Sequence, residues 1–379
     1  MAPRVAALAF VLGTGCSAVF GLEPPAHEGL NDAPASPDPD SLVDACPSLS
    51  TVVSTCGMTF TGDFSLGSGD LTYNTDTRTF QPNFGGTLPS YEFTTATGPI
   101  IVLAFHGLTL GSNSNLRVLG SKPLALIVEG AFTLSGTIDV GVGGANHRTC
   151  DAVAGVAGNG GAGGGGGGGF ASIGGTGGDG NIDGTVHVGG NAGTAQSRPS
   201  APRGGCDGGI GGDAGGSGGT IGRGGGAILI AAGSIQVSSN GRIDASGGGG
   251  GGGKVADSGA GGGGSGGFIL LETASLQIDG TVVANGGGGG EGGDASTGGN
   301  PGARSSTINA APGGSGNSIE GGDGGAGGAA MSTAGHPSNQ QKNGGGGGGG
   351  GGVGFISFRA PQVVITSGSV ISPAQLTWP

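Results

Sequence analysis

Residues 125–144 read ALIVEGAFTLSGTIDVGVGG, and the pattern returns as AILIAAGSIQVSSNGRIDASGGG over 227–249 and FILLETASLQIDGTVVANGGG over 268–288. In each copy an apolar run is followed by an apolar-x-apolar pair and then by a Gly-x-apolar-x-small segment. The pairs are Phe132/Leu134, Ile235/Val237 and Leu276/Ile278. Two further copies begin at Ile101 and Phe355, and a partial one begins at Gly62. The alternation predicts three short strands in each copy.

A repeat of this size indicates how the strands assemble. A unit of about 20–24 residues cannot bury its own apolar face, so similar units are expected to stack on one another. We therefore predict an all-β fold, a parallel β-solenoid of about six coils over residues 46–379, rising about 4.8 Å per coil. An antiparallel β-sandwich is the alternative. It explains less well why long insertions recur at one place in the unit.

Glycine accounts for 101 of the 379 residues, which is about 27% against a usual share of about 7%. Collagen is excluded because the 19 prolines are too few and no strict Gly-X-Y period is present. Most of the glycine falls in three insertions, 141–226, 246–267 and 286–354, each of which follows a predicted third strand. We expect adjacent loops that either pack as polyglycine II strands, which only glycine permits, or remain flexible.

The predicted first strands are apolar on both faces. They read LALIV, AILIA, FILLE and IIVLA. Continuous apolar runs are typical of strands that are covered on both sides. We expect the glycine loops to fold back over the outer face, or a second copy or another partner to cover it.

The first 16 residues, MAPRVAALAFVLGTGC, have the order of a secretory signal peptide, with Arg4 before an apolar run that is too short to span a bilayer. The cysteine at the end, Cys16, resembles the lipidated cysteine of the bacterial lipoprotein lipobox, although Gly13 stands where a leucine is usual. Residues 17–45 are acidic and rich in proline, which predicts a disordered tether.

Four cysteines remain, Cys46, Cys56, Cys150 and Cys206, an even number that is typical of disulfides in an exported protein. Three pairings are open, and we favour Cys46 with Cys56 and Cys150 with Cys206. The sequence has no CxxC motif, and its five histidines lack ligand spacing, so neither a metal site nor a cofactor is predicted.

Neither the charge nor the remaining motifs indicate a catalytic site. The net charge of −12 comes from 13 basic and 25 acidic residues, which form no basic stripe for a phosphate backbone, so no nucleic-acid partner is predicted. Asp139 and Asp244 hold the same repeat position, so they are predicted to lie about 4.8 Å apart, near the carboxylate spacing of retaining glycosidases. No basic or aromatic cluster is expected around them. We therefore interpret the pair as a solvated surface ladder.

The segments VLGTGCSAVFGLEPP and LALIVEGAFTLSGTIDV, together with the polyglycine runs, resemble glycine-rich surface lipoproteins of Gram-negative bacteria. The strand units are similar to those of haemagglutinin-like adhesins. This resemblance implies a non-enzymatic, structural or adhesive protein, lipid-anchored through Cys16 at the outer membrane or cell surface, with a surface glycan or protein as partner. The alternatives are a ligand-binding module built on an ordered polyglycine II bundle and a β-helix enzyme that acts on polysaccharides.

Overall fold

The computed structural model describes residues 48–82, 88–158, 161–215, 217–330, 332, 334–338 and 343–377. The predicted signal peptide, the tether, Cys16 and Cys46 lie outside these residues. Within the described residues every helix or strand element is a β-strand, in agreement with the predicted all-β class.

The strands recur with the sequence repeat, but the prediction of three short strands in each copy is wrong for 124–134, 227–237 and 268–278, where the predicted first and second strands form one continuous strand of 11 residues. The long strands are β1 (Phe64–Asn74), β4 (Gly98–Phe105), β5 (Leu108–Leu119), β6 (Leu124–Leu134), β10 (Ala227–Val237) and β12 (Phe268–Ile278), with the shorter β14 (Phe355–Arg359) and β15 (Gln362–Ile365) at the end of the series. The short third strands are β7 (Thr137–Asp139), β11 (Arg242–Asp244), β13 (Thr281–Val283) and β16 (Val370–Ser372). The others are β2 (Thr79–Gln81), β3 (Ser90–Thr95), β8 (Gly180–Ile182), β9 (Thr185–His187) and β17 (Leu376–Thr377).

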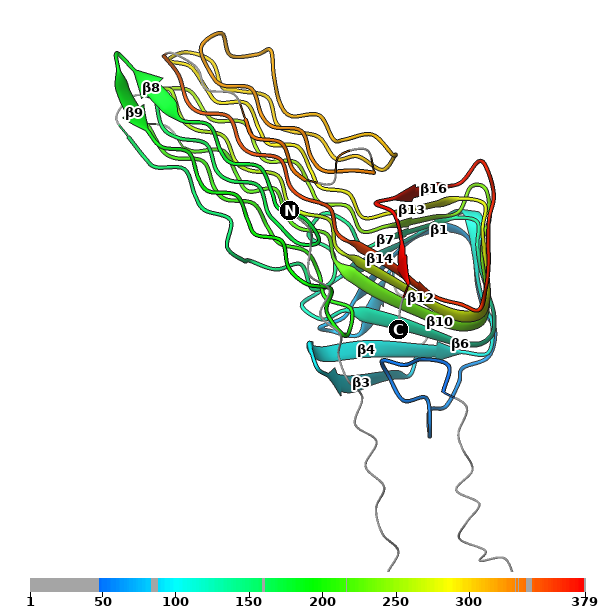
Figure 1. Cartoon of the computed structure of the whole chain (residues 1–379). Coiled ribbons are helices and arrows are strands. Elements are labelled where there is room, and N and C mark those ends of the chain that lie inside the picture. The colour runs from blue at the N-terminus through cyan, green and yellow to red at the C-terminus, as the bar shows by residue number, and fades with distance from the viewer. Residues whose placement is uncertain are drawn as a thin grey trace, which may run out of the picture. The chain divides into compact units, whose positions relative to one another are not determined.

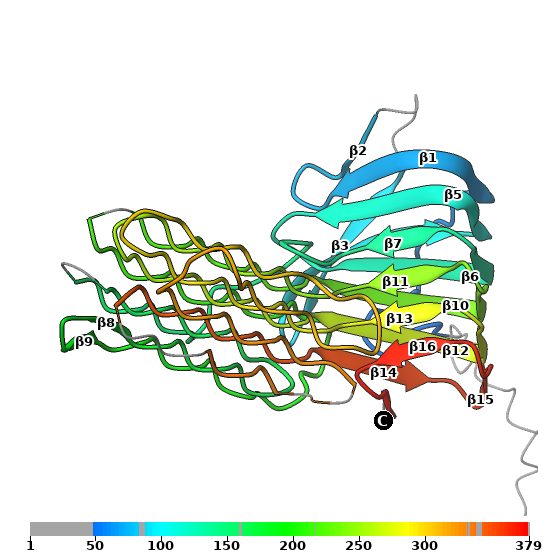
Figure 2. The same ribbon diagram turned by 90° about the horizontal axis from the view of Figure 1, so that it is seen from above.

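Most strands belong to one large curled sheet (Figures 1 and 2). Its main path runs β16-β13-β11-β7-β5-β6-β10-β12-β14-β17, and each neighbouring pair along this path is parallel. Antiparallel pairing in this sheet is confined to β1 with β2 and β3 with β4 among the described strands. The alternative prediction of an antiparallel β-sandwich is therefore wrong.

The strand register matches the alignment of the sequence repeats. Ile235 lies opposite Phe132 on one side and Leu276 on the other, so the apolar-x-apolar pairs stack on one another. In the third strands Ile243 lies between Ile138 and Val282. A one-residue slip would turn these side chains to the other face, so the apolar repeat specifies the register.

The side chains inside the curl form the main core. Leu126, Ile230 and Leu271 from the first part of three neighbouring strands pack with Phe132, Ile138 and their equivalents, and all are 0–1% exposed. Complete burial of such a side chain contributes roughly 1.5–3 kcal/mol. The repeated strands are thus stabilised by apolar contacts between copies, as a stacked unit requires.

A second apolar layer covers the outer face of the first strands. Its strand residues, such as Ile127, Leu229 and Leu270, pack against Val53 and its neighbours in the 49–60 segment and against Tyr91 and Phe93 of β3. The glycine insertions contribute Phe170 and Ala171. The expectation that glycine loops cover this face is therefore wrong for most of it, because large apolar side chains from elsewhere in the chain bury it instead.

A buried carboxylate fastens the covering segment to the sheet. Glu272 of β12 is 0% exposed and accepts hydrogen bonds from Ser50 Oγ at 2.5 Å and from the Thr51 N–H at 3.2 Å. The Thr51 hydroxyl donates to the same carboxylate. These donors compensate for the loss of water around the charge.

Candidate functional site

The chain between each third strand and the following first strand forms one projecting body, which we call the glycine bundle (Figure 1). It is built from the segments 140–226, 245–267 and 284–354. We call the end joined to the sheet the base and the end that carries the β8–β9 hairpin the tip (Figure 2). Backbone hydrogen bonds between extended segments hold the body together.

The segment 163–168 shows the bonding pattern most clearly. Its N–H groups donate in turn to three neighbouring segments, at N···O distances of 2.8–3.0 Å. The acceptors are the carbonyls of Val156, Gly178, Ala260, Val153, Gly175 and Gly263, so every third residue bonds to the same neighbour. A period of three residues per turn without hydrogen bonds inside the segment is the geometry of the polyproline II and polyglycine II helix.

The carbonyls of this segment are bonded just as regularly. They accept from the N–H groups of Gly212, Gly190, Gly349, Gly209, Gly193 and Gly352, which belong to three further segments. The segment therefore has six hydrogen-bonded neighbours. The same holds for 258–266, 286–294 and 344–354, and the remaining segments form one layer around these four. The described residues of the insertions are ordered by these bonds, so the flexible-loop alternative does not apply to them.

Glycine is required in these inner segments because a backbone carbonyl occupies the place of a side chain. A Cβ atom added at Gly348 would lie 1.9 Å from the carbonyl oxygen of Gly261, and one at Gly262 would lie 2.0 Å from that of Gly166. A side chain cannot displace a neighbour that is itself bonded on all sides. The glycine runs 163–169 and 344–352 lie in inner segments, whereas the run 247–253 belongs to the surrounding layer.

The outer segments carry side chains at every third residue. In 188–194 the residues Val188, Asn191 and Thr194 are exposed, whereas Gly190 and Gly193 are buried. The segment 217–223 likewise exposes Ser217, Thr220 and Arg223. The bundle thus presents a regular lattice of side chains on a backbone frame. A period of Gly-Gly-x, visible in GGTGGDG over 174–180, is the signal in the sequence that indicates this arrangement.

Two acidic residues at the tip end of an inner segment replace glycine for a specific reason. The Glu291 carboxylate is buried and accepts from the backbone N–H groups of Asn300, Asn317 and Ser318 at 2.8–3.0 Å. Burial acts to raise the pKa of Asp294, but backbone donors from Ser296, Ile319 and Thr297 outweigh it and hold the pKa below its usual value. Both carboxylates bind the tip loops to the bundle.

Asp257, in contrast, is a buried carboxylate at the tip whose Oδ1 has no hydrogen-bond partner. Burial raises its pKa, and the nearby charges of Asp294 and Glu320 raise it further. Such a group stabilises the fold most when it is protonated, below its unfolded-state pKa, and this contribution is lost as pH rises through the folded-state pKa.

We predict that Asp257→Asn raises the free energy of unfolding at pH 7 by about 1 kcal/mol, because it removes an unpaired buried charge. Asparagine also tolerates the positive φ of this residue, 59°. Urea unfolding at pH 7 and pH 3.5 measures the effect, which should shrink at the lower pH. A variant less stable than the wild type at pH 7 would contradict it.

A disulfide joins Cys150 to Cys206 near the base, with a Cα–Cα distance of 5.4 Å. It is one of the two pairings favoured from the sequence. Cys56 is also disulfide-bonded, but its predicted partner Cys46 lies outside the described residues. The Cys150–Cys206 bond ties the first outer segment to a neighbour 56 residues further along the chain.

Removal of this disulfide in Cys150→Ser/Cys206→Ser is expected to lower the free energy of unfolding by about 2–4 kcal/mol, because the unfolded chain regains the entropy of a long open loop. Chemical denaturation under non-reducing conditions gives the value. Equal stability of the variant and the wild type would contradict the prediction.

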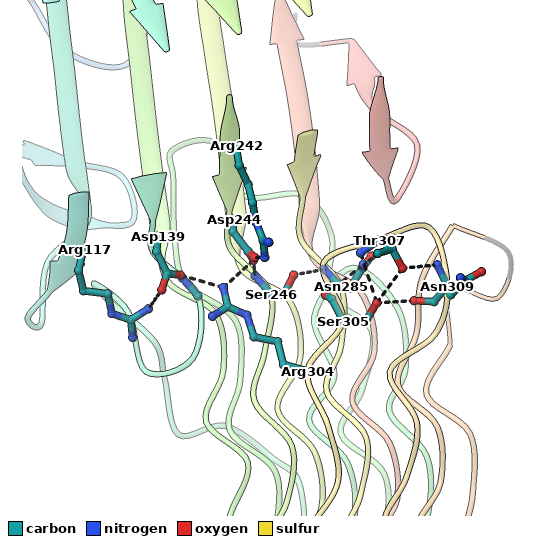
Figure 3. Close-up of polar contacts among 11 residues, drawn as sticks. Arg117, Asp139, Arg242, Asp244, Ser246, Asn285, Arg304, Ser305, Thr307 and Asn309 are labelled. Atoms are coloured by element: carbon teal, nitrogen blue, oxygen red, sulfur yellow. Dashed lines mark hydrogen bonds and ion pairs between the residues drawn. The ribbon is translucent and has the colours of Figure 1, made fainter. Parts of the chain in front are cut away.

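The aspartate pair singled out in the sequence lies where the bundle meets the sheet (Figure 3). Asp139 of β7 and Asp244 of β11 are partners in register, as their shared repeat position predicts. Arg304, from the third insertion, reaches between them, and its Nη2 lies 2.8 Å from Asp139 Oδ1 and 2.8 Å from Asp244 Oδ1. Arg117 pairs with Asp139, and Arg242 pairs with Asp244.

The expectation that no basic cluster surrounds these aspartates is therefore wrong. Burial acts to raise the pKa of Asp139, but the hydrogen bond and charge of Arg304 and the charge of Arg117 hold it below its usual value. Asp244 has a side chain only 1% exposed. The arginines thus favour the ionised form of Asp139, and the Asp244 side chain is almost inaccessible to solvent, whereas glycoside hydrolysis needs one protonated carboxyl group that can reach the substrate.

Polar contacts continue from the aspartates along the junction. A loop of the third insertion covers this edge, and the Asn285 side-chain amide donates to the Thr307 carbonyl at 2.7 Å. The Asn285 N–H bonds to Ser246 Oγ, and Ser372 Oγ donates to Asn285 Oδ1. A cavity of about 260 Å³ adjoins the ion pairs, lined by Asn115, Thr137, Asp139, Arg242, Asp244 and Arg304. We assign the cluster to fixing the bundle on the sheet.

The described residues include no group of three or more His, Cys, Asp or Glu side chains arranged to hold a metal ion. Nor do these residues contain a helix with the length and apolar character needed to cross a bilayer. Comparison of the chain with models of known protein families, with curated proteins and with solved structures gives no match. Function is therefore inferred from the chain's own geometry.

Proposed function

We propose that this chain is a non-enzymatic cell-surface lipoprotein with an adhesive or structural role. In this proposal the sheet is a parallel β-solenoid of about six coils that supports the glycine bundle, and the bundle is the contact surface. The observation that carries the proposal is the lattice of the bundle. Exposed side chains recur at every third residue of its outer segments, on a frame whose inner segments have six bonded neighbours. Because such a frame is already ordered, its backbone loses little conformational entropy when a partner binds.

The anchor is the part of the proposal that the N-terminal sequence supports. Lipidation of Cys16 would hold the protein at the outer membrane, and the acidic tether would separate the folded body from the lipid surface. Two described residues, Ser50 and Thr51, fasten the start of this body to the sheet through Glu272. A pull on the tether would therefore be passed directly to β12.

Fatty-acid labelling of cells that express the wild type or Cys16→Ser tests the anchor. We expect label on the wild-type protein and none on the variant, since the thiol is the acylated atom. Adhesion of the same two cell lines to one another and to uncoated surfaces tests the role, and we expect the variant to lose it. Equal labelling would overturn the anchor, and equal adhesion would overturn the adhesive role.

The cavity beside Asp139 and Asp244 favours the alternative of a polysaccharide-acting enzyme. We set it second because both carboxylates are paired with arginines. Incubation of purified wild type and Asp139→Ala/Asp244→Ala with a panel of polysaccharides distinguishes the two. Release of reducing ends by the wild type alone would establish the enzyme.

A further inference from the structure

The first insertion builds one face of the bundle, which we call the first-insertion face. It consists of the outer segments 188–194, 153–158, 207–213 and 217–223. Val156 N–H bonds to the carbonyl of Val188, and Gly155 N–H bonds to that of Ile210, which places the first three segments side by side. Gly211 N–H bonds to Gly219, which adds the fourth.

The centre of this face is apolar and open to solvent. Val153, Val156, Val188 and Ile210 are 45%, 50%, 59% and 50% exposed. On the opposite side of the bundle the exposed residues at equivalent positions are polar or proline, among them Asn300, Pro312 and His336. Other exposed isoleucines, Ile173, Ile308 and Ile319, lie elsewhere in the insertions. Four half-exposed β-branched side chains on neighbouring segments are typical of a contact surface.

Two opposite charges flank this apolar centre at equal distances. The bonds from Gly211 to Gly219 and from Gly208 to Gly222 place Thr220 level with Ile210. From that level Asp213 lies three residues toward the tip and Arg223 three residues toward the base, about 9 Å each at 3.1 Å per residue. Both residues are exposed.

We propose that the first-insertion face binds the same face of a second copy of this chain, with the two bundles antiparallel. The two-fold axis lies in the contact plane, perpendicular to the long axis of the bundle, and crosses the segments at the level of Ile210. It sets Ile210 against the partner's Ile210 and Val156 against the partner's Val156. The same rotation brings Asp213 beside Arg223 of the partner subunit, and the pair forms twice. A parallel arrangement would instead set Asp213 beside the partner's Asp213, which like charges disfavour.

The charges of the whole insertion favour the same orientation. All four of its arginines belong to the base, namely Arg148, Arg198, Arg203 and Arg223, whereas Asp179, Asp183 and Asp213 lie at the tip. Two aspartates also lie at the base, Asp151 bonded to Thr194 and Asp207 bonded to the Gly224 N–H, so the four arginines still outnumber the acidic residues there. Antiparallel copies therefore place each acidic tip on a basic base.

The size of the face indicates reversible association. Four segments about 4.8 Å apart and about seven residues long make a face of about 20 by 22 Å, or about 900 Å² over both copies. That area is at the low end for specific complexes, so many anchored copies would be needed for firm attachment. This inference rests on the proposed function, because an antiparallel contact joins proteins anchored on opposing surfaces.

Sedimentation equilibrium of the Cys16→Ser protein between 1 and 200 µM tests the proposal. We expect a monomer–dimer equilibrium, weakened at least tenfold in Ile210→Asp. Asp213→Arg alone and Arg223→Asp alone should each be monomeric, because both bridges become repulsive. An equimolar mixture of these two variants should form a heterodimer, since each bridge then joins opposite charges again. Glu320→Arg, an exposed change at the tip, is the matched control and should dimerise like the wild type.

Rescue in the mixture also shows that both variants are folded. A wild type that is monomeric at 200 µM overturns the proposal, and so does a mixture that stays monomeric. If self-association fails while labelling of Cys16 and adhesion of cells to other surfaces persist, the proposed function stands with a different partner. If dimers form but adhesion is absent, the contact is an assembly interface and the adhesive role fails.

Discussion

Gly348→Ala is expected to lower the free energy of unfolding by about 5 kcal/mol, although it adds only one methyl group. The new Cβ would lie 1.9 Å from the carbonyl oxygen of Gly261. Gly348 also donates to Gly290 and accepts from Gly325, both at 2.8 Å, so its segment cannot move aside without breaking further bonds. Denaturant unfolding gives the loss, and hydrogen exchange should localise it to the inner segments.

Gly298→Ala is the matched control within the same bundle. Its Cβ would lie 3.1 Å from the carbonyl oxygen of Gly253, with no closer neighbour. We expect a change within about 1 kcal/mol, because the outer segment can shift by a few tenths of an ångström. If both variants are equally stable, backbone contact does not explain the glycine runs.

Arg304→Met is expected to lower the free energy of unfolding at pH 7 by about 4 kcal/mol, since it leaves two neighbouring carboxylates at the junction with one arginine each. Arg304 lies within 2.8 Å of both Asp139 and Asp244. The pKa of Asp139 lies below its usual value of 3.8 in the fold, so its contribution is present above that pH and is lost as pH falls through the folded-state pKa. The difference between variant and wild type should therefore shrink below about pH 4.

Two further variants test whether the loss of stability comes from the ion pairs of Arg304. Arg359→Met removes an exposed arginine at the end of the sheet and should cost less than about 1 kcal/mol. In the background Asp139→Asn/Asp244→Asn, Arg304→Met should cost much less than in the wild type, because no carboxylate is left unpaired. An equal cost in both backgrounds would show that Arg304 acts through packing alone.

The strand order and register were predictable because they depend on side chains that repeat. Ile138, Ile243 and Val282 stack because each copy places its apolar residues at the same positions. Asp139 and Asp244 are neighbours for the same reason. The pairing of Cys150 with Cys206 also agrees with the sequence, where the two cysteines enclose a glycine-rich stretch.

The surroundings of the aspartates were not predictable in this way. Arg304 is 165 residues from Asp139 in the chain and belongs to an insertion without a repeat counterpart. The residues that cover the outer face of the first strands were likewise not predicted, because Val53 and Tyr91 lie outside the repeats. Contacts of this kind depend on which loops the fold brings together.

The sequence by itself determined a repeating parallel β unit and the requirement for glycine between the units. Only the tertiary structure decided that the inner glycine segments pack with six neighbours each. The physical reason is that a glycine run carries no side chain to specify a partner, and the entropy lost on ordering it nearly equals the free energy of its own hydrogen bonds. Order arises when the sheet fixes both ends of every insertion at one corner, so that all segments pair together.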